Sequence, residues 1–260
     1  MRLSFVVPTR NQARFIRRCL DSCIAQGIAG GEILVQDGLS IDGTQEILAS
    51  YGQRIDWVSE RDAGQADAVN KAVARARGEV IAWVNSDDYY PDPACVGAAL
   101  AELERPPEAD LVYGDGLVVS AGGTPIRPYR NRTFATVRDL LVAPIGPSQP
   151  ATFFRRRLFL EVGGLRTDLH YGLDYELWLR MFPRARRIRR LERPLACMTF
   201  HADAKSTRAM LPQIREVRRF KAEHARANGL GLVDRLRVTT GIGAMYAYWL
   251  AVRTGLRKAT

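Results

Sequence analysis

Two adjacent carboxylates, Asp87 and Asp88, follow an apolar segment over residues 80–85 that predicts a buried β-strand. Neighbouring side chains point apart in an extended chain, so the two carboxylates can hold two different groups. One can bind a divalent cation such as Mg²⁺ or Mn²⁺, which takes carboxylate, phosphate and water oxygens. The other can accept a hydrogen bond from a hydroxyl group. An acidic turn in solvent or a helix N-cap is the alternative, and the dipeptide alone leaves both interpretations open.

A second polar segment, over residues 36–44, also follows an apolar run. Asp37 ends the expected strand and could accept hydrogen bonds from the edge of a nucleobase. Gly38 and Gly43 permit a sharp loop before the next helix. The same residues are equally typical of a structural turn, so the segment by itself does not decide its role.

The third segment runs from residue 60 to residue 71 and again follows a predicted strand. Asp67, Asn70 and Lys71 are spaced i, i+3 and i+4, so they share one face of a helix. This face could serve a ligand at the end of the strand. Taken alone, it could also be the ordinary exposed side of a helix that packs through its alanines and valines.

The elements that must position these segments alternate in the first half of the chain. Apolar runs predict strands over residues 3–7, 32–36, 55–59 and 80–85, and helical spacing predicts helices over 11–25, 44–50 and 65–77. Strands and helices that alternate with short loops predict an α/β fold, with a parallel sheet covered on both faces. Ligands bind such sheets at the carboxyl ends of the strands, where the three polar segments lie.

The pattern changes in the second half of the chain. We expect a helix over residues 93–104, strands over 110–113, 117–120, 148–154 and 195–200, helices over 174–182 and 210–228, and a helical tail over 232–256. No internal repeat and no low-complexity linker is present, which predicts one domain with a C-terminal extension.

The ordered set of motifs resembles the inverting family 2 glycosyltransferases, which have the GT-A fold. The resemblance covers about residues 3–205. It implies a Rossmann-like, mixed and mainly parallel central sheet flanked by helices. It runs through Val6-Val7-Pro8-Thr9-Arg10-Asn11, Asp37-Gly38, Ser40, Asp42-Gly43-Thr44, the segment 60–71, Gly78-Glu79, Ile81, Trp83, Asn85-Ser86-Asp87-Asp88, Gln149-Pro150-Ala151-Thr152-Phe153-Phe154 and Asp174-Tyr175-Glu176-Leu177-Trp178-Leu179-Arg180.

The resemblance implies a nucleotide-diphospho-sugar donor, with a UDP-sugar as the first expectation and GDP- or TDP-sugars as alternatives. Thr9 and Asp37 would hold the base. Asp62 and Asp67 would lie near the base and the ribose, and Asp87 would bind the ribose side. The full set of residues expected to bind the donor is Pro8, Thr9, Asn11, Asp37, Asp62, Asp67, Lys71, Ser86 and Asp87.

The resemblance also implies a Mn²⁺ or Mg²⁺ ion that bridges the diphosphate, with Asp88 as its ligand. A diphosphate leaving group needs positive charge, which such an ion supplies. Ser86 stands where many relatives have the first carboxylate of an Asp-x-Asp motif, which lowers the protein's share of the metal ligands. His201 follows an expected strand and is a second metal candidate, with a histidine in a surface loop as the alternative.

Inverting transfer needs one general base to take the proton of the attacking hydroxyl. The family has this base at an aspartate that opens a helix, and Asp174 matches that position. Leu173 departs from the relatives that carry a second acid just before this aspartate. A first-turn acid that stabilises the helix dipole is the alternative role for Asp174.

The charge of the chain is divided between its two parts. The protein has 260 residues, 47% of them hydrophobic, and a net charge of +10. Residues 1–152 hold 15 basic and 19 acidic residues, whereas residues 153–260 hold 23 basic and 9 acidic ones. The apolar content excludes disorder as the main state, and four cysteines are too few for a disulfide scaffold.

These observations predict a catalytic domain over residues 1–205 and a basic helical extension over 206–260. Within the domain, residues 1–90 form the nucleotide-sugar half and residues 91–205 the acceptor half. The basic part predicts an anionic partner: a glycan or lipid-linked acceptor, or a membrane surface that the extension contacts peripherally. We expect a cytoplasmic protein at the inner face of the cell membrane, with a homodimer as one arrangement, and no nucleic-acid partner.

Two other function classes compete with sugar transfer in polysaccharide, glycolipid or cell-envelope glycan synthesis. A nucleotidyltransferase on a similar sheet would need a glycine-rich loop after the first strand, and residues 8–12 contain no glycine. A non-enzymatic module for RNA or anionic lipid would use the basic part, but the chain carries no nucleic-acid-binding motif.

Overall fold

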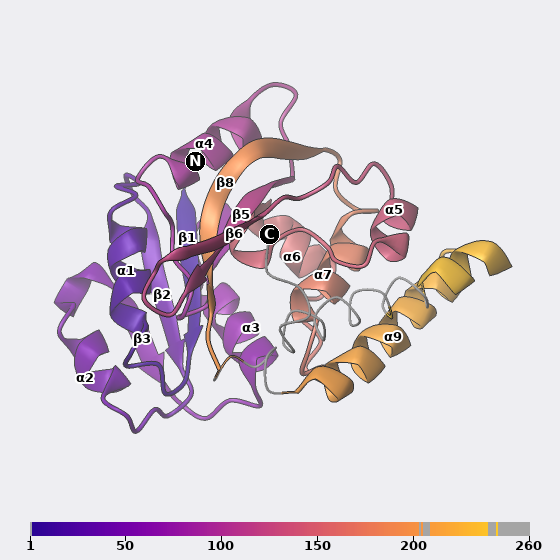
Figure 1. Ribbon diagram of the computed structural model, residues 1–260. Helices are drawn as coiled ribbons and strands as arrows, with labels where there is room; N and C mark the ends of the chain where they lie inside the picture. The colour runs from indigo at the N-terminus through magenta and orange to yellow at the C-terminus, as the bar shows by residue number, and fades with distance from the viewer. Residues whose placement is uncertain (1, 203, 205–208, 239–242, 244–260) are drawn as a thin grey trace.

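The computed structural model describes residues 2–202, 204, 209–238 and 243, and an eight-stranded sheet forms its centre (Figure 1). The strand order is β3-β2-β1-β4-β7-β5-β6, and β8 pairs with β5 outside this path. The strands are β1 (Leu3–Thr9), β2 (Glu32–Asp37), β3 (Asp56–Ser59), β4 (Val80–Trp83), β5 (Leu111–Ser120), β6 (Pro125–Tyr129), β7 (Thr152–Arg155) and β8 (Ile188–Phe200).

Helices cover both faces of the sheet, as the alternating pattern predicts. Strand side chains alternate between two hydrophobic clusters: Val6 and Ile81 face one, and Phe5 and Ala82 face the other. The first cluster includes residues of α3, α5, α6, α7 and α9, and the second includes residues of α1, α2 and α4. The helices are α1 (Ile16–Ile24), α2 (Thr44–Ala49), α3 (Gln65–Arg75), α4 (Cys95–Glu104), α5 (Val137–Val142), α6 (Arg156–Glu161), α7 (Leu173–Met181) and α9 (Met210–Ala227), with short 3₁₀ turns at Gly52–Arg54 and Gln149–Ala151.

The expected α/β fold with a mixed, mainly parallel sheet is confirmed. Pairing is parallel for β1 with β2, β1 with β4, β2 with β3 and β5 with β8, and antiparallel for β4 with β7 and for β5 with β6 and β7. In the parallel part, Thr9 pairs with Asp37 and Asp37 pairs with Ser59. Three strands therefore end at the same level of the sheet and present polar residues along one edge.

The first helix begins later than residue 11, where helical spacing first suggests it. The backbone N–H groups of Asn11 and Ala13 bond to side chains of the loop that follows β2, that of Gln12 bonds to the hydroxyl of Thr44 at the start of α2, and Asn11 has a positive φ of 53°. A residue with positive φ lies outside the helical region, and the carbonyl oxygen of Gln12 closes a turn by accepting from the N–H groups of Phe15 and Ile16, so α1 begins at Ile16.

The second half of the sheet differs from the expected strands in four places, and the first is β6, which no expected strand covers. Residues 111–120 form one strand, because Asp115 is held within it by the backbone N–H of Asn131 and by Arg190, although two register shifts flank Asp115. The strand expected at 195–200 begins already at Ile188. The strand expected at 148–154 begins with a 3₁₀ turn over 149–151, so β7 starts at Thr152.

Helix α9 packs against α5 and α7. Val217, Phe220 and Ala225 belong to the same hydrophobic cluster as α7, and the ring of Phe220 meets that of Tyr175 edge-on at 6.2 Å. Residues 232–238 are helical as expected. Most of the helical tail expected up to residue 256, and residues 206–208 of the extension, lie outside the described residues.

Lys221 of α9 is fully buried at this contact. Its Nζ donates to the carbonyl oxygen of Ala143 at 2.6 Å and to the hydroxyl of Tyr175 at 2.9 Å. Burial disfavours the charged ammonium and lowers the pKa of Lys221 to about 7. An unfolded chain would keep the ordinary, much higher value, so folding releases a proton from this lysine above neutral pH.

We predict that a Lys221→Met variant changes the pH dependence of stability. Between about pH 7.5 and about pH 9.5 the unfolded lysine is protonated and the folded one is not, so the free energy of unfolding of the wild type should rise relative to the variant by about 1.4 kcal/mol per pH unit. Below neutral pH both states of the lysine are protonated and the relative slope should vanish. Urea denaturation at several pH values measures both slopes, and parallel curves across the alkaline range would contradict the prediction.

Candidate functional site

The carboxyl ends of β1, β2 and β3 form a polar edge. The carbonyl oxygen of Thr9 accepts from the N–H of Gly38 at 2.9 Å, and the carbonyl oxygen of Asp37 accepts from the N–H of Glu60 at 3.0 Å. The hydroxyl of Thr9 is buried and has no hydrogen-bond partner among the described residues. Buried polar groups normally have partners, so this hydroxyl is an attachment point for a polar ligand.

Asp37 is fully buried, and other protein groups already occupy its carboxylate. It accepts from the hydroxyl of Ser40 at 2.5 Å, from the N–H of Ser40 at 3.1 Å and from the hydroxyl of Ser59 at 2.6 Å. This geometry is that of a structural turn anchor, one of the two roles its sequence segment allows. The contact of Asp37 with a base stays a prediction.

The loop after β1 is tied to the loop after β2. Asn11 donates its backbone N–H to the hydroxyl of Ser40 at 2.7 Å and accepts from the N–H of Ile41 at 2.9 Å. Pro8 lies within β1, opposite Gln36. The two loops therefore form one rigid wall beside the unpartnered hydroxyl of Thr9.

The third polar segment closes the same edge. One carboxylate oxygen of Asp62 accepts from the N–H of Gly64 at 2.9 Å, and the other lies where a Cβ at Gly38 would be only 2.5 Å away. Lys71 reaches back from α3 and holds this loop, with Nζ 3.2 Å from Asp67, 3.3 Å from Glu60 and 2.8 Å from the carbonyl oxygen of Arg61. The structure thus brings the residues predicted around the base together on neighbouring loops.

The two adjacent carboxylates lie where the end of β4 meets the end of β8. Asp88 is buried and accepts from the backbone N–H of Thr199 at 2.9 Å, and an Asp87 oxygen lies 3.1 Å from Nε2 of His201. Burial raises the pKa of Asp88 well above its ordinary value, and the neighbouring charge of Asp87 raises it further. Ser86 is buried beside them.

These residues fit a cation that is shared with a diphosphate. Two crowded carboxylates favour a positive ion, because the nearby Arg18 lowers the pKa of Asp88 by less than burial and Asp87 raise it. His201 has a second ring nitrogen, Nδ1, that is buried and unpartnered among the described residues. The described part of the chain contains no cluster of three or more His, Cys, Asp or Glu that could hold a metal on its own. Hard cations commonly complete such a set with phosphate oxygens and water.

Three polar motif residues to which the sequence assigned no role in the donor site contact one another beside the adjacent carboxylates. Asn85 donates to Gln149 at 2.8 Å and accepts from Gln65 at 2.7 Å, and the amide of Gln149 also bonds to the carbonyl oxygen of Trp83. Gln149 comes from the 3₁₀ turn rather than from a strand. The motifs contain all three residues, but their contact could not be predicted, because the partners of Asn85 lie 20 and 64 residues away in the sequence.

Arg18 of α1 is a residue that the motifs missed. Its guanidinium donates to the hydroxyl of Thr199 at 2.9 Å and lies 4.3 Å from the centre of the Tyr89 ring. Thr199 also donates its N–H to Asp88, so Arg18 braces the β8 segment that holds the carboxylate. It is one of many arginines with no motif around it, and sequence alone does not distinguish it.

Asp174 lies in the first turn of α7, after Gly172, which has a positive φ of 59°. It is half-buried, and burial raises the pKa of Asp174 above its ordinary value. Among the described residues, no hydrogen bond or ion pair joins Asp174 to Asp87 or Asp88.

One loop connects the surroundings of Asp174 with those of Asp87 and Asp88. The carbonyl oxygen of Ala143 lies 2.8 Å from the hydroxyl of Tyr175, the residue after Asp174, and that of Gly146 accepts from Tyr129 at 3.1 Å. The loop then continues to Gln149, which contacts Asn85 beside the adjacent carboxylates. The position of α7 is therefore coupled through this loop to the end of β4.

The sequence model of the family described as "Glycosyl transferase family 2" matches residues 4–163, more than half of the chain. The chain belongs to this family. Membership favours sugar transfer over the nucleotidyltransferase and the non-enzymatic binding module.

Relatives and solved structures agree with this family and fold. A PGL/p-HBAD biosynthesis glycosyltransferase of Mycobacterium bovis is 28% identical over 187 residues, which is 69% of each protein. The structure of Staphylococcus aureus TarS with UDP-GlcNAc has a TM-score of 0.69 at 18% identity and covers 93% of this chain and 71% of that one. The mannosyltransferase PcManGT of Pyrobaculum calidifontis, with GDP-Man and Mn²⁺, has a TM-score of 0.63 at 18% identity, over 98% of this chain and 79% of that one.

The chain spans 31% to 58% of the length of three other curated relatives that it matches. These similarities show the family and the GT-A fold.

We predict that Gly38→Ala weakens nucleotide binding by displacing Asp62. The new Cβ would meet the Asp62 carboxylate at 2.5 Å, and that flexible end can rotate away, so the loss of stability should stay below about 1 kcal/mol. Because Gly38 acts through Asp62, the effects of Gly38→Ala and Asp62→Ala on UDP affinity should not add in the double variant. Calorimetric titration with UDP measures all three.

The matched control is Gly97→Ala in α4, where an added Cβ meets nothing within 4 Å. This exposed helical position should gain about 0.5–1 kcal/mol and leave UDP binding unchanged. Additive losses at Gly38 and Asp62, or full affinity in Gly38→Ala, would refute the role given to their contact.

Proposed function

We propose that this protein transfers a sugar, with inversion, from a nucleotide-diphospho-sugar to an acceptor hydroxyl in polysaccharide, glycolipid or cell-envelope glycan synthesis. The observation that carries the proposal is the convergence of the ends of β1, β2, β3 and β4 on one polar edge, with Asp87 and Asp88 facing β8. A UDP-sugar is the first candidate donor, and GDP- and TDP-sugars are the alternatives.

The nucleoside would lie against the two joined loops. Thr9 offers a buried hydroxyl that lacks a partner among the described residues, and Asn11 fixes the loop beside it. Pro8 and Asp37 shape this wall from within the sheet. Asp62, Asp67 and Lys71 would bound the base and ribose from the loop after β3.

The diphosphate would lie over the end of β4. Asp87 would contact the ribose side and Ser86 would line the floor, whereas Asp88 and His201 would hold a Mn²⁺ or Mg²⁺ ion. When bound, such an ion neutralises the negative charge that develops on the leaving diphosphate. Thr199 and Asn85 keep the Asp88 carboxylate in place by donating to it, at 2.9 Å and 3.5 Å.

Asp174 would act as the general base. As the acceptor oxygen forms its bond to C1 of the sugar, the bond from C1 to the diphosphate oxygen breaks on the opposite face, and the hydroxyl proton passes to the Asp174 carboxylate. A carboxylate whose pKa is raised by burial binds this proton more readily than an ordinary one. Asp174 lies in the first turn of α7, which fixes the direction in which its carboxylate points.

The acceptor side would receive an anionic molecule. Residues 153–260 carry 23 basic against 9 acidic residues, which favours a phosphate-bearing acceptor such as a lipid-linked intermediate. No described helix is long and apolar enough to cross a membrane.

We predict that Asp174→Asn lowers the rate of transfer by about 10²- to 10⁴-fold and leaves donor binding intact, because an amide cannot take the proton. Asp88→Ala should abolish transfer and also weaken Mn²⁺-dependent donor binding. Product formation and donor affinity are measured on the purified variants.

Asp139→Asn is the control for the alternative role of Asp174 as a first-turn acid. Asp139 opens α5 in a capping box with Thr136, so this variant should lose about 1 kcal/mol of stability and keep its activity. If Asp174→Asn behaves in the same way, Asp174 is a helix-stabilising residue and the base lies elsewhere.

We further predict that a nucleotide-sugar stabilises the protein against heat in the presence of Mn²⁺. A donor at about 100 times its dissociation constant should add about 2.7 kcal/mol to the free energy of unfolding. A thermal-shift panel of UDP-, GDP- and TDP-sugars, each with and without Mn²⁺, identifies the nucleotide. A panel in which no donor shifts the midpoint would contradict the proposed activity.

A further inference from the structure

Helix α9 has two faces of different character. One face is buried against the catalytic part, with Val217, Lys221 and His224 spaced i, i+4 and i+7. The arginines of the helix lie on other sides and are exposed. The buried face accounts for how α9 is held, and it leaves the concentration of arginines unexplained.

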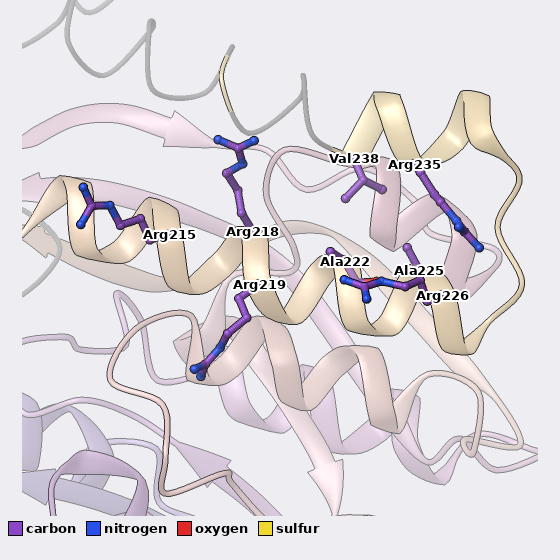
Figure 2. Close-up of a pocket in the computed structure, with 8 residues that line it drawn as sticks. All are labelled: Arg215, Arg218, Arg219, Ala222, Ala225, Arg226, Arg235 and Val238. Carbon is purple, nitrogen blue, oxygen red and sulfur yellow. The ribbon is translucent and has the colours of Figure 1, made fainter.

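Four of these arginines, together with Arg235 of the helical residues 232–238, line one cavity of about 330 Å³ between the two helical segments (Figure 2). They are Arg215, Arg218, Arg219, Arg226 and Arg235, and we call this cavity the arginine pocket. Among the described residues, the others that line it are two alanines and Val238, and none of them is acidic. Arg215 and Arg218 have no ion-pair partner within 4.0 Å in the described part of the chain.

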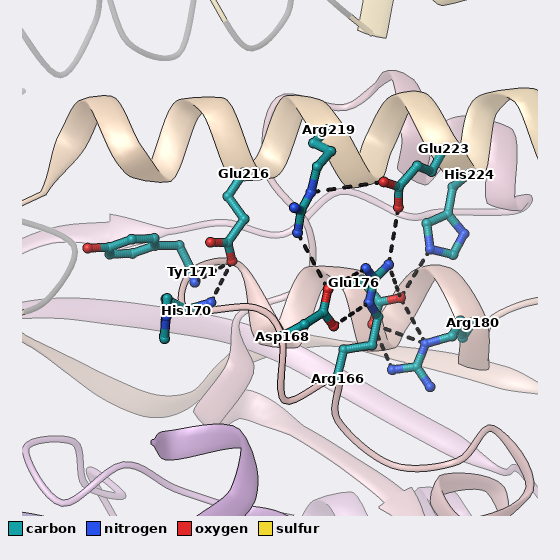
Figure 3. A network of polar contacts seen from close by, with 10 residues as sticks. All are labelled: Arg166, Asp168, His170, Tyr171, Glu176, Arg180, Glu216, Arg219, Glu223 and His224. Carbon is teal, nitrogen blue, oxygen red and sulfur yellow. Dashed lines mark hydrogen bonds and ion pairs between the residues drawn. The ribbon is translucent and has the colours of Figure 1, made fainter. Parts of the chain in front are cut away.

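The two walls of the arginine pocket are fixed in place. On the α9 side, Glu176 of α7 lies 3.1 Å from Nε2 of His224, and Glu216 accepts from the backbone N–H groups of His170 and Tyr171 (Figure 3). Glu176 is buried, and hydrogen bonds from His224 and Arg180 offset the effect of burial and hold the pKa of Glu176 below its ordinary value.

The opposite wall is held by a separate ion pair. Asp234 receives two hydrogen bonds from Arg138 of α5, at 2.6 and 2.7 Å. This paired geometry fixes both the distance and the orientation of the 232–238 segment. The arginine pocket is therefore a preorganised cavity, because both helical segments that line it are held in place.

The positive charge of the pocket favours the binding of an anion. Arg219 has carboxylates at 3.5 Å (Asp168) and 3.9 Å (Glu223), which compensate it only in part. Guanidinium groups gathered on one short stretch of surface repel each other, and they bind phosphate oxygens through two parallel N–H donors. A phosphate group would relieve the repulsion and fill the cavity.

Exposed apolar residues beside the pocket indicate the source of that phosphate. Leu232 is 75% exposed and precedes Arg235 by three residues, so both lie on one face of the same helical segment. Val233 is 63% exposed next to it. Arginines combined with exposed leucine and valine are typical of a surface that lies on an anionic membrane, where the apolar groups enter the headgroup region.

We propose that the arginine pocket binds the phosphate of an anionic lipid headgroup and so docks this protein on a membrane surface. Leu232 and Val233 enter the headgroup layer when the pocket is occupied. The site is separate from the residues proposed for sugar transfer, and the inference does not depend on that function. Because α9 packs on α7, this docking would also hold the polar edge of the sheet at the membrane.

Co-sedimentation with vesicles tests the proposal. The wild type should bind vesicles of phosphatidylcholine mixed with phosphatidylglycerol, and neither bind vesicles of phosphatidylcholine alone nor keep its binding at high salt. Arg215→Gln/Arg218→Gln should bind the mixed vesicles about 30-fold more weakly, which corresponds to about 1 kcal/mol for each basic residue removed.

The matched control is Arg105→Gln/Arg184→Gln, which removes the same charge from two exposed arginines outside the pocket. It should bind as the wild type does, and so should Asp174→Asn, which separates this proposal from the proposed transfer activity. Equal loss of binding in both double variants would overturn the proposal, because net charge alone would then explain it. Binding of inorganic pyrophosphate in the pocket without any vesicle binding would overturn the lipid assignment.

Discussion

The parallel pairing of β1 with β2 and β4 is the constraint on which the candidate site depends. Thr9, Asp37 and Ser59 share one level of the sheet because three strands run in the same direction and end together. A shift of one residue in this register would turn their side chains to the opposite face. The hydrogen bonds of the Asp37 carboxylate to Ser40 and Ser59 fasten the two loops at that level.

The second half of the chain completes the site from the other side. Strand β8 pairs with β5 over its whole length and delivers Thr199 and His201 to Asp88 and Asp87, over 110 residues away in sequence. The buried carboxylate of Asp88 therefore owes its environment to a segment on the far edge of the sheet. Arg18 and Tyr89 reinforce the same junction from α1 and from the β4 loop.

Helix α9 serves two surfaces at once. Its inner face shares a hydrophobic cluster with α7, and Lys221 reaches the loop that runs from α5 to the end of β4. Its arginines gather at the outer cavity. Since the same helix contacts the residue that follows Asp174 and carries the arginine pocket, the proposed base and the proposed membrane contact have a fixed geometry relative to each other.

Sequence alone determined the alternating strands and helices of the first 90 residues, the family and the carboxylate motifs, because periodicity and turn residues are local signals. Tertiary structure decided the late start of α1, the continuous β5, the 3₁₀ turn at Gln149 and the burial of Lys221. Asn85 meets Gln149 across 64 residues and Lys221 meets Ala143 across 78. Such contacts arise when packing brings distant side chains into one low-dielectric space, and no local pattern encodes which polar groups will share it.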